Sequence, residues 1–525
     1  MLTQNGIKLA VYIITNDFGK LVAQVCECLL RRGSLTRQGI ARFAELPSEK
    51  VKKCLWILIQ HNCVQAFALE QQGDLGKPPI VNTHYMALLG NIVQRIRFPK
   101  FLAIAKGELS QQVGPTNGQQ CALLLEGLLQ HGRLTLTQIL DRATQEDENN
   151  ADPKAVRERF FLLVKNRFVE HCPSPEPHMP LPPEGEQPTK KRGSKSSHTT
   201  IKEVALEEQA LADAMPMEAE RFSVDAVTTA DTENETNRNG VFAIRSGEKR
   251  KLMEVESELD DVFPEKEPIW RVNFHEFNRL LRNKACIDTV RTRLDDNAAK
   301  VLSAMLKASG SSASTVSVTL DAIFEELLKS NQTMTMTLDH VRTILDDIGC
   351  DSDRVDMYSL GLSDIIKQAK IEEIESIVLK RYGREAYRIF RLLRSNSLYL
   401  DTDKISDRVF IDKKEATKIL FKLWKDNFLH MEKVSRGGIK DKDALLWKAN
   451  DSNLYYEILD ELYHAVLNLQ IRSNYEKDQR RELLQISKEA LTGENKTNLD
   501  RLRKRMMLLV NCILKLDDAL LLFQD

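Results

Sequence analysis

Three stretches of the chain share one pattern of apolar and polar positions, in which an apolar helix end is followed by a polar turn and a short apolar strand. They align without gaps at residues 58–65 (LIQHNCVQ), 163–170 (LVKNRFVE) and 423–430 (LWKDNFLH). Before each stretch apolar residues recur at helical spacing, as in Val51, Leu55 and Leu58, and a further short helix is expected at 37–45, 136–144 and 404–410. The order helix, helix, helix, strand, turn, strand predicts a winged-helix domain for each copy.

A fourth winged helix is expected at residues 269–366, between the second and third of these copies. Its helices are predicted at about 274–293, 295–308, 319–330 and 337–348, with a wing near 355–360. The Leu-x-x-x-Asn-x-Val signature is absent from this stretch, so the prediction depends on helical periodicity alone.

The last seventy or so residues follow a different pattern, that of two long helices joined by a short polar turn. In the first helix Leu454, Ile458 and Leu462 recur at a spacing of four, and in the second Leu502, Met506 and Leu509 recur at four and three. The pattern predicts an antiparallel coiled-coil hairpin. We expect its outer face to pack on a partner, and packing on the rest of the same chain is the alternative.

All sixteen prolines lie at or before Pro268, and seven of them fall between Pro173 and Pro188. They open a segment rich in Ser, Thr, Glu and Asn that we expect to be a largely disordered linker. The predicted fold is therefore mainly α, with small β-wings. It comprises winged helices at 1–90, 91–172, 269–366 and 367–452, an acidic linker at 173–268, and the hairpin at 453–525.

The formal net charge of -1 conceals two oppositely charged parts. Residues 173–268 hold 12 Lys and Arg against 21 Asp and Glu, which gives -9, so the rest of the chain carries +8. Two basic clusters in the linker, at 190–192 and 249–251, have two interpretations: nuclear-import signals, or chance triplets in a charged segment. The basic excess of the predicted domains keeps nucleic-acid binding open.

The last winged helix has the strongest basic excess: residues 375–450 contain 18 basic and 11 acidic residues. On its third helix four lysines occur at i, i+4, i+8 and i+11, and its wing carries three more basic residues. Lysine binds phosphate without reading bases, so this pattern predicts sequence-independent DNA contact, with an acidic protein surface as the alternative. The candidate phosphate contacts are Lys414, Lys418, Lys422, Lys425, Arg436, Lys440 and Lys442, together with Lys50, Lys52 and Lys53 in the first domain.

The sequence lacks the common catalytic and metal-binding patterns. The nine cysteines are scattered and form no CxxC pair, which argues against a zinc ribbon. Nucleotide-binding, nucleophile-elbow and zinc-protease motifs are also absent, so we expect no catalytic residue, cofactor or small-molecule substrate. No apolar run reaches the length of a membrane span.

Short segments along nearly the whole chain, with the linker as the divergent part, carry a resemblance to a known family. They are Val51-Lys52-Lys53-x-Leu55, Leu58-x-Gln60-His61-Asn62-x-Val64, Arg97-x-Pro99, Trp270-x-x-Asn273 with Phe277, Arg381-x-Gly383, Arg388-Ile389-Phe390-Arg391-Leu392, Lys414-Glu415-Ala416 and Asn427-Phe428. In these segments the chain resembles the third-largest subunit of eukaryotic RNA polymerase III, and we interpret it as a plant member of that family.

This resemblance implies a nuclear, non-catalytic polymerase subunit with four extended winged helices and a coiled-coil hairpin, similar to the large subunit of the initiation factor TFIIE. It implies two smaller partner subunits, docking on the clamp of the largest subunit, and DNA contact during promoter opening and initiation at small-RNA genes. The zinc ribbon of the TFIIE relative is missing here.

Two other functions are alternatives. One is a winged-helix docking subunit of a proteasome-lid-like or translation-initiation assembly. Such chains carry one winged helix after a helical solenoid, and three aligned copies along this chain argue against it. The other is an enzyme, for which the sequence offers no motif.

Overall fold

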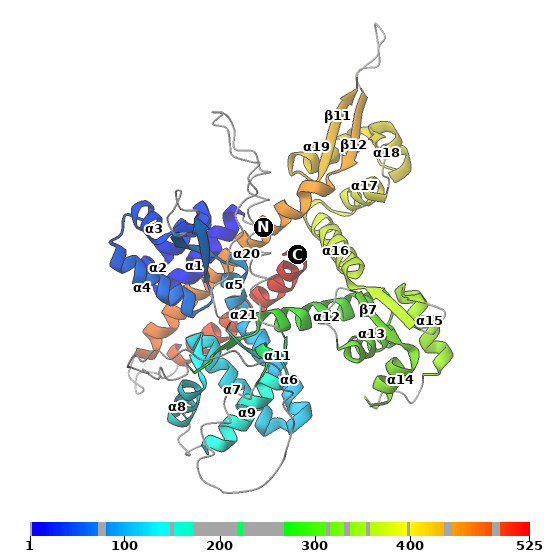
Figure 1. Ribbon diagram of the computed structural model, residues 1–525. Helices are drawn as coiled ribbons and strands as arrows, with labels where there is room; N and C mark the ends of the chain where they lie inside the picture. Colours follow the sequence, from blue (N-terminus) through cyan, green and yellow to red (C-terminus); the bar gives the residue numbers. More distant parts are fainter. Residues whose placement is uncertain are drawn as a thin grey trace, which may run out of the picture. The chain divides into compact units, whose positions relative to one another are not determined.

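The computed structural model describes residues 3–71, 80–146, 152–172, 218–223, 267–310, 315–329, 336–352, 357–395, 399–434, 444–485 and 494–524. Contacts divide the chain into two compact units. The first unit contains residues 1–32, 88–97 and 275–525, and the second contains residues 33–87 and 98–274. The described residues are mainly helical, with small three-stranded sheets, as the sequence predicted (Figure 1).

Four stretches of the described chain repeat one order of elements, as in an extended winged helix. Each consists of two helices, a short strand, two more helices and two further strands. The first stretch contains α1 (Gln4–Phe18), α2 (Lys20–Arg32), β1 (Leu35–Thr36), α3 (Arg37–Phe43), α4 (Ser48–Gln60), β2 (Val64–Gln71) and β3 (Ile80–Ala87). After α5 (Leu89–Gln94) and η1 (Arg95–Arg97), the second contains α6 (Phe98–Val113), α7 (Pro115–His131), β4 (Leu134–Thr135), α8 (Leu136–Glu146), α9 (Pro153–Lys165), β5 (Val169–His171) and β6 (Ile269–Val272).

The third and fourth copies follow the same order. The third contains α12 (Phe274–Arg293), α13 (Asp296–Ser309), β7 (Thr315–Thr319), α14 (Leu320–Lys329), α15 (Leu338–Ile348), β8 (Asp351–Ser352) and β9 (Met357–Gly361). The fourth contains α16 (Leu362–Tyr382), α17 (Arg384–Ser395), β10 (Leu400–Asp401), α18 (Thr402–Val409), α19 (Lys413–Lys425), β11 (Leu429–Val434) and β12 (Ala444–Ala449). In all four sheets the last strand lies between the other two and is antiparallel to both.

The third copy confirms all four helices predicted from periodicity, each within a residue or so of its expected ends. Asp295 caps α13 by accepting a hydrogen bond from the backbone N–H of Ala298 at 2.7 Å. Its core includes Val301, Ile323 and Val341, which are fully buried. The missing signature also has a physical explanation. The turn after the third helix needs a positive φ, which Asn62, Arg167 and Asn427 supply in the other copies and Gly349 supplies here.

The second copy completes its sheet with a strand that lies beyond the linker. We expected residue 269 to open the third domain, but Ile269–Val272 pairs with β4 and β5 instead. Trp270 of this strand is fully buried and its ring meets Phe160 edge-on at 5.0 Å. The linker is therefore inserted between two strands of one wing, and the expected boundary at 268/269 is wrong. The strand pairs non-locally, so periodicity alone could not assign it.

A short piece of the expected linker also has a defined place in the second unit. Residues 218–223, including α11 (Glu218–Arg221), lie against β5. The guanidinium of Arg221 pairs with Glu170, which also accepts from Arg271 Nε at 2.8 Å. His171 Nε2 lies 2.9 Å from the carbonyl oxygen of Ser223. This piece has a defined place within a segment that we expect to be largely disordered, and residues 173–217 and 224–266 of that segment lie outside the described residues.

Within the second unit the end of α4 fits closely against the end of α7. The backbone N–H of Arg133 donates to the carbonyl of Gln60 at 2.9 Å, and Arg133 Nε donates to Asn62 Oδ1 at 2.8 Å. Gly132 has a φ of +80°, and a Cβ there would lie 2.1 Å from the Gln60 oxygen. Only glycine fits this close approach of two backbones.

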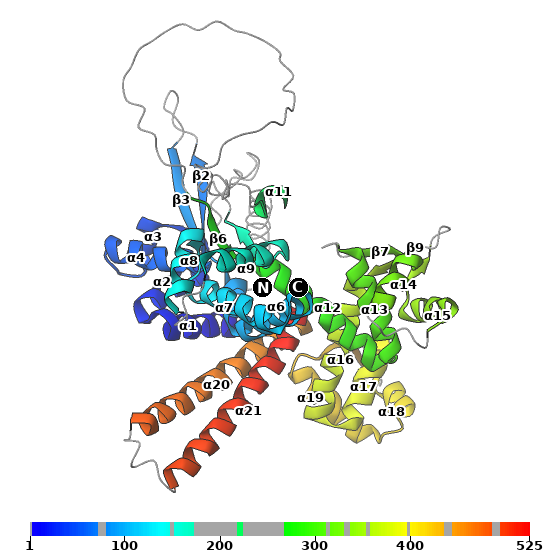
Figure 2. The same cartoon turned by 90° about the horizontal axis from the view of Figure 1, so that it is seen from below.

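The C-terminal residues form α20 (Asp451–Gln485) and α21 (Glu494–Phe523), which pack along each other as the predicted hairpin (Figure 2). The pairs show that the helices are antiparallel: the Tyr455 ring lies 6.0 Å from that of Phe523, and Arg505 reaches Glu476 at 3.3 Å. Coiled-coil packing in the strict sense stays a prediction. Part of the hairpin packs on its own chain, since α1 lies along α20 and Asn5 donates twice to Asp460.

A buried ion pair joins the base of the hairpin to residues far away in sequence within the first unit. Arg97 Nε donates to Asp517 Oδ1 at 2.7 Å, and both side chains are 1% exposed. Arg97 also donates to Gln524 Oε1 at 2.6 Å. The amide of Gln524 in turn donates to the Tyr463 hydroxyl at 3.1 Å. The segment Arg97-x-Pro99 that carries the family resemblance thus contains a structural residue of the first unit.

Among the described helices, none combines the length and apolar character needed to cross a bilayer. The same residues hold no group of three His, Cys, Asp or Glu side chains arranged to bind a metal ion.

Candidate nucleic-acid interface

The lysine row predicted in the last winged helix lies on α19. The side chain of Asp412 caps this helix by accepting from the backbone N–H of Lys414 at 3.2 Å. Ala416, Leu420 and Leu423 are buried on its inner face, against α17, α18 and β11. This apolar face fixes the rotation of the helix and leaves the opposite face in solvent.

We call the four exposed lysines of that face, Lys414, Lys418, Lys422 and Lys425, the α19 lysine row. At 100° per residue they span about 80° of arc, and eleven residues of helix rise about 16 Å. The phosphates of one DNA strand follow each other every 3.4 Å or so along the axis. The row therefore has the length to contact several phosphates of one strand.

The base of α19 adds two details to this surface. Lys422 Nζ lies 5.2 Å from the centre of the Tyr382 ring, a cation–π contact that orients its chain. The Tyr382 hydroxyl donates to Asp426 Oδ2 at 2.5 Å. Burial, together with this bond to a carboxylate, raises the pKa of Tyr382 above its usual value. Asp426 is thus hydrogen-bonded beside the row.

Lys413, which precedes the row, differs from it because it forms an ion pair. It pairs with Asp403 of α18, and this hydrogen bond, reinforced by the carboxylates of Asp401 and Asp407, raises its pKa. The acidic residues of α18 therefore mark one limit of the basic surface.

The other predicted contacts divide into two groups. Lys50, Lys52 and Lys53 are exposed on α4, the third helix of the first copy, which belongs to the second compact unit. Trp56, one turn further along, is 69% exposed. The α19 lysine row belongs to the first unit, so each group is a candidate surface of its own unit. The wing residues Arg436, Lys440 and Lys442 lie outside the described residues.

Sequence reasoning missed a second basic helix in the same domain. Arg384, Arg388 and Arg391 of α17 are exposed at i, i+4 and i+7, the same kind of spacing that identified the α19 lysine row. These arginines contribute to the basic excess of residues 375–450, but their helical spacing is a separate signal from that of the lysines.

Three family models match the chain. The one described as the RNA polymerase III subunit RPC82 helix-turn-helix domain covers residues 8–69, the one described as RNA polymerase III subunit RPC82 covers 158–354, and the one described as the POLR3C C-terminal winged-helix domain covers 374–442. Each contains third helices or wings of the repeated winged-helix unit.

Curated relatives match over nearly the whole length. The chain is 23% identical to the DNA-directed RNA polymerase III subunit RPC3 of Homo sapiens, over 93% of this chain and 87% of that protein. It is 23% identical to the protein of the same name from Bos taurus, over 100% and 98%. With the rpc3 subunit of Dictyostelium discoideum the identity is 21%, over 98% and 99%.

Proposed function

From the premise that the chain belongs to the family of the third-largest subunit of RNA polymerase III, we propose that it acts in the nucleus as an accessory, non-catalytic subunit of that polymerase. It docks on the clamp of the largest subunit, in a subcomplex with two smaller subunits. It contacts DNA during promoter opening and initiation at small-RNA genes. The end-to-end likeness to RPC3 proteins is the observation that carries this proposal.

The α19 lysine row supports the DNA contact. Four exposed ammonium groups in a row about 16 Å long suit the phosphates of a strand and offer no fork for base edges. The contact is therefore independent of sequence. Lys50, Lys52 and Lys53 on α4 offer a second, shorter surface of the same chemistry.

The hairpin supports docking on another subunit. Ile471 and Tyr475 of α20 and Met507 and Leu508 of α21 are between 47% and 70% exposed. Large apolar side chains left in solvent on long helices are typical of surfaces that a partner covers. The shared winged-helix repeat and the family match argue against a proteasome-lid-like or translation-initiation subunit.

The DNA contact is tested by replacing all four lysines of the α19 lysine row with alanine. Each phosphate contact contributes about -0.9 to the slope of log affinity against log salt, so the slope should flatten by up to about 3.6. Fluorescence anisotropy with a labelled duplex measures it. Promoter-dependent transcription of a small-RNA gene in depleted nuclear extract should be restored by the wild-type chain and poorly by the variant. An unchanged salt slope would make the row a protein-docking face.

A further inference from the structure

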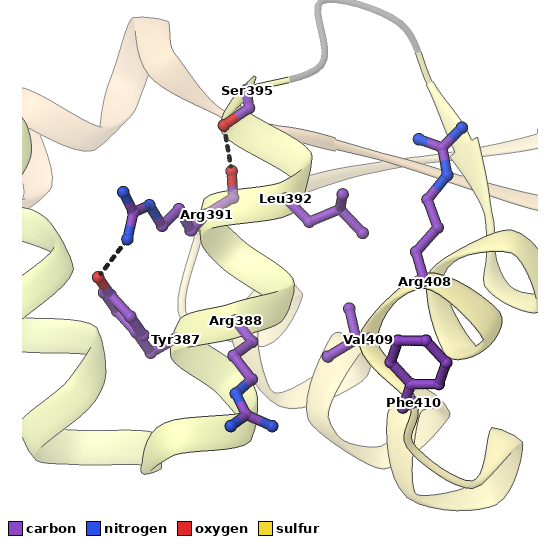
Figure 3. Close-up of a pocket in the computed structure, with 8 residues that line it drawn as sticks. All are labelled: Tyr387, Arg388, Arg391, Leu392, Ser395, Arg408, Val409 and Phe410. Atoms are coloured by element: carbon purple, nitrogen blue, oxygen red, sulfur yellow. Dashed lines mark hydrogen bonds between the residues drawn. The ribbon is translucent and has the colours of Figure 1, made fainter.

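The fourth winged helix has a pocket on the side formed by α17 and α18, apart from the outer face of α19. It measures about 540 Å³ and is lined by Tyr387, Arg388, Arg391, Leu392, Ser395, Arg408, Val409 and Phe410. Leu392 and Val409, which we call its floor, point toward each other, and the side chains of Arg388 and Arg408 extend away from this pair in opposite directions (Figure 3). We call it the arginine pocket.

The charges of this pocket are available for a ligand. Arg391 Nη1 lies 3.2 Å from the hydroxyl of Tyr387, and no ion pair is formed by Arg388, Arg391 or Arg408 within the part of the chain that the structure describes. All three side chains are exposed. A planar guanidinium matches a carboxylate with two parallel hydrogen bonds.

Phe410 adds an apolar group at the rim. Its side chain is 94% exposed, although it sits beside the buried Val409. Its φ of +57° is imposed by the helix-turn-helix, because Glu45 has a φ of +53° at the corresponding turn of the first copy. The turn therefore tolerates a polar residue, and glycine or asparagine would fit it best. The contacts of the exposed Phe410 ring show no role for it in stabilising the fold.

We propose that the arginine pocket binds an acidic segment of a partner protein, in which carboxylates flank one large apolar side chain. The carboxylates pair with Arg388 and Arg408, and the apolar side chain enters over Leu392 and Val409 beneath the ring of Phe410. Arginine clusters are a recurring means of binding acidic motifs. This surface is additional to the DNA contact and does not depend on it.

The surroundings favour a short peptide over a nucleic acid. The carboxylates of Asp401, Asp403 and Asp407 lie near the start of α19, where they act on Lys413. A phosphate chain extended from the α19 lysine row across α18 would meet them, and none of the three lines the arginine pocket. The floor is also apolar, so the polar edges of a base would lose their hydrogen bonds to water there.

The test uses the full chain and two labelled probes: a synthetic peptide with one phenylalanine between runs of glutamate, and oligothymidylate. The double variant Arg388→Glu, Arg408→Glu should lower peptide affinity at least about tenfold, as should Phe410→Ala. Arg384→Glu is the matched control, since it reverses one exposed charge of α17 outside the pocket. It should change the affinity by less than about threefold.

Phe410→Gly separates binding from folding. Glycine suits the positive φ, so this variant should unfold at the same temperature as the wild type or higher and still lose peptide affinity. Failure of the wild-type chain to bind the peptide would overturn the proposal. So would equal losses for Arg384→Glu and the double variant, or a loss of oligothymidylate affinity alone, which would make the pocket a nucleic-acid site.

Discussion

Removing the carboxylate of Asp517 should destabilise the first compact unit far more than removing an ion-pair partner at its surface. In the wild type Arg97 and Asp517 are each 1% exposed and joined at 2.7 Å. In Asp517→Ala the guanidinium stays buried, keeps its bond to Gln524, and loses its counter-charge. Breaking a buried pair in this way costs about 3–5 kcal/mol.

The expected effect can be read as a melting temperature. A loss of 1 kcal/mol lowers the midpoint of a domain of this size class by roughly 2–4 °C, so the first unit of Asp517→Ala should unfold roughly 6–20 °C below the wild type. Thermal unfolding of the full chain measures the shift. Hydrogen–deuterium exchange should locate the loss of protection in α21 and η1, the elements that the pair joins.

Asp17→Ala is the matched control, because Arg95 of the same η1 turn pairs with Asp17 at 2.6 Å and that carboxylate is 35% exposed. A partly exposed pair contributes only about 0–1 kcal/mol. If Asp17→Ala and Asp517→Ala lower the melting temperature by similar amounts, burial does not determine how much the Arg97 ion pair stabilises the unit.

Two further substitutions test local features of the two units. Gly132→Ala should destabilise the second unit by roughly 3 kcal/mol, from backbone strain and the contact with Gln60; Gly33→Ala, whose φ is +82° with no atom near, should show the strain alone in thermal unfolding. Burial and neighbouring carboxylates, Asp346 among them, raise the pKa of Cys350 to about 12, so its thiol stays protonated at pH 8. Asp346→Asn should lower the pKa of Cys350 and so speed alkylation of its thiol by iodoacetamide, which mass spectrometry can follow. An unchanged alkylation rate would show that the Asp346 carboxylate does not raise this pKa.

The repeated domains were predictable because their signals are local. Apolar residues three and four positions apart indicate a helix. The gap-free match of residues 58–65, 163–170 and 423–430 covers the end of one helix, one turn and the start of one strand. All three stretches run from the third helix into the wing, as expected. The α19 lysine row was found for the same reason, since its spacing is that of one helical face.

What was missed depends on residues distant in sequence. Trp270 of β6 pairs with His171, which lies 99 residues earlier in the chain. A four-residue strand has no periodicity of its own that would reveal this pairing. The partner of Arg97 lies 420 residues away. The arginine pocket requires two helices side by side and a phenyl ring that packing leaves outside, neither of which the helical spacing of α17 specifies.

Membership of an RNA polymerase III complex is the central claim, and copurification tests it most directly. The chain is tagged at one end and purified from nuclei under mild salt, and the proteins that accompany it are identified by mass spectrometry. The account predicts the largest subunit of RNA polymerase III and two smaller subunits in stoichiometric amounts. Proteasome-lid or translation-initiation subunits in place of polymerase subunits would contradict it.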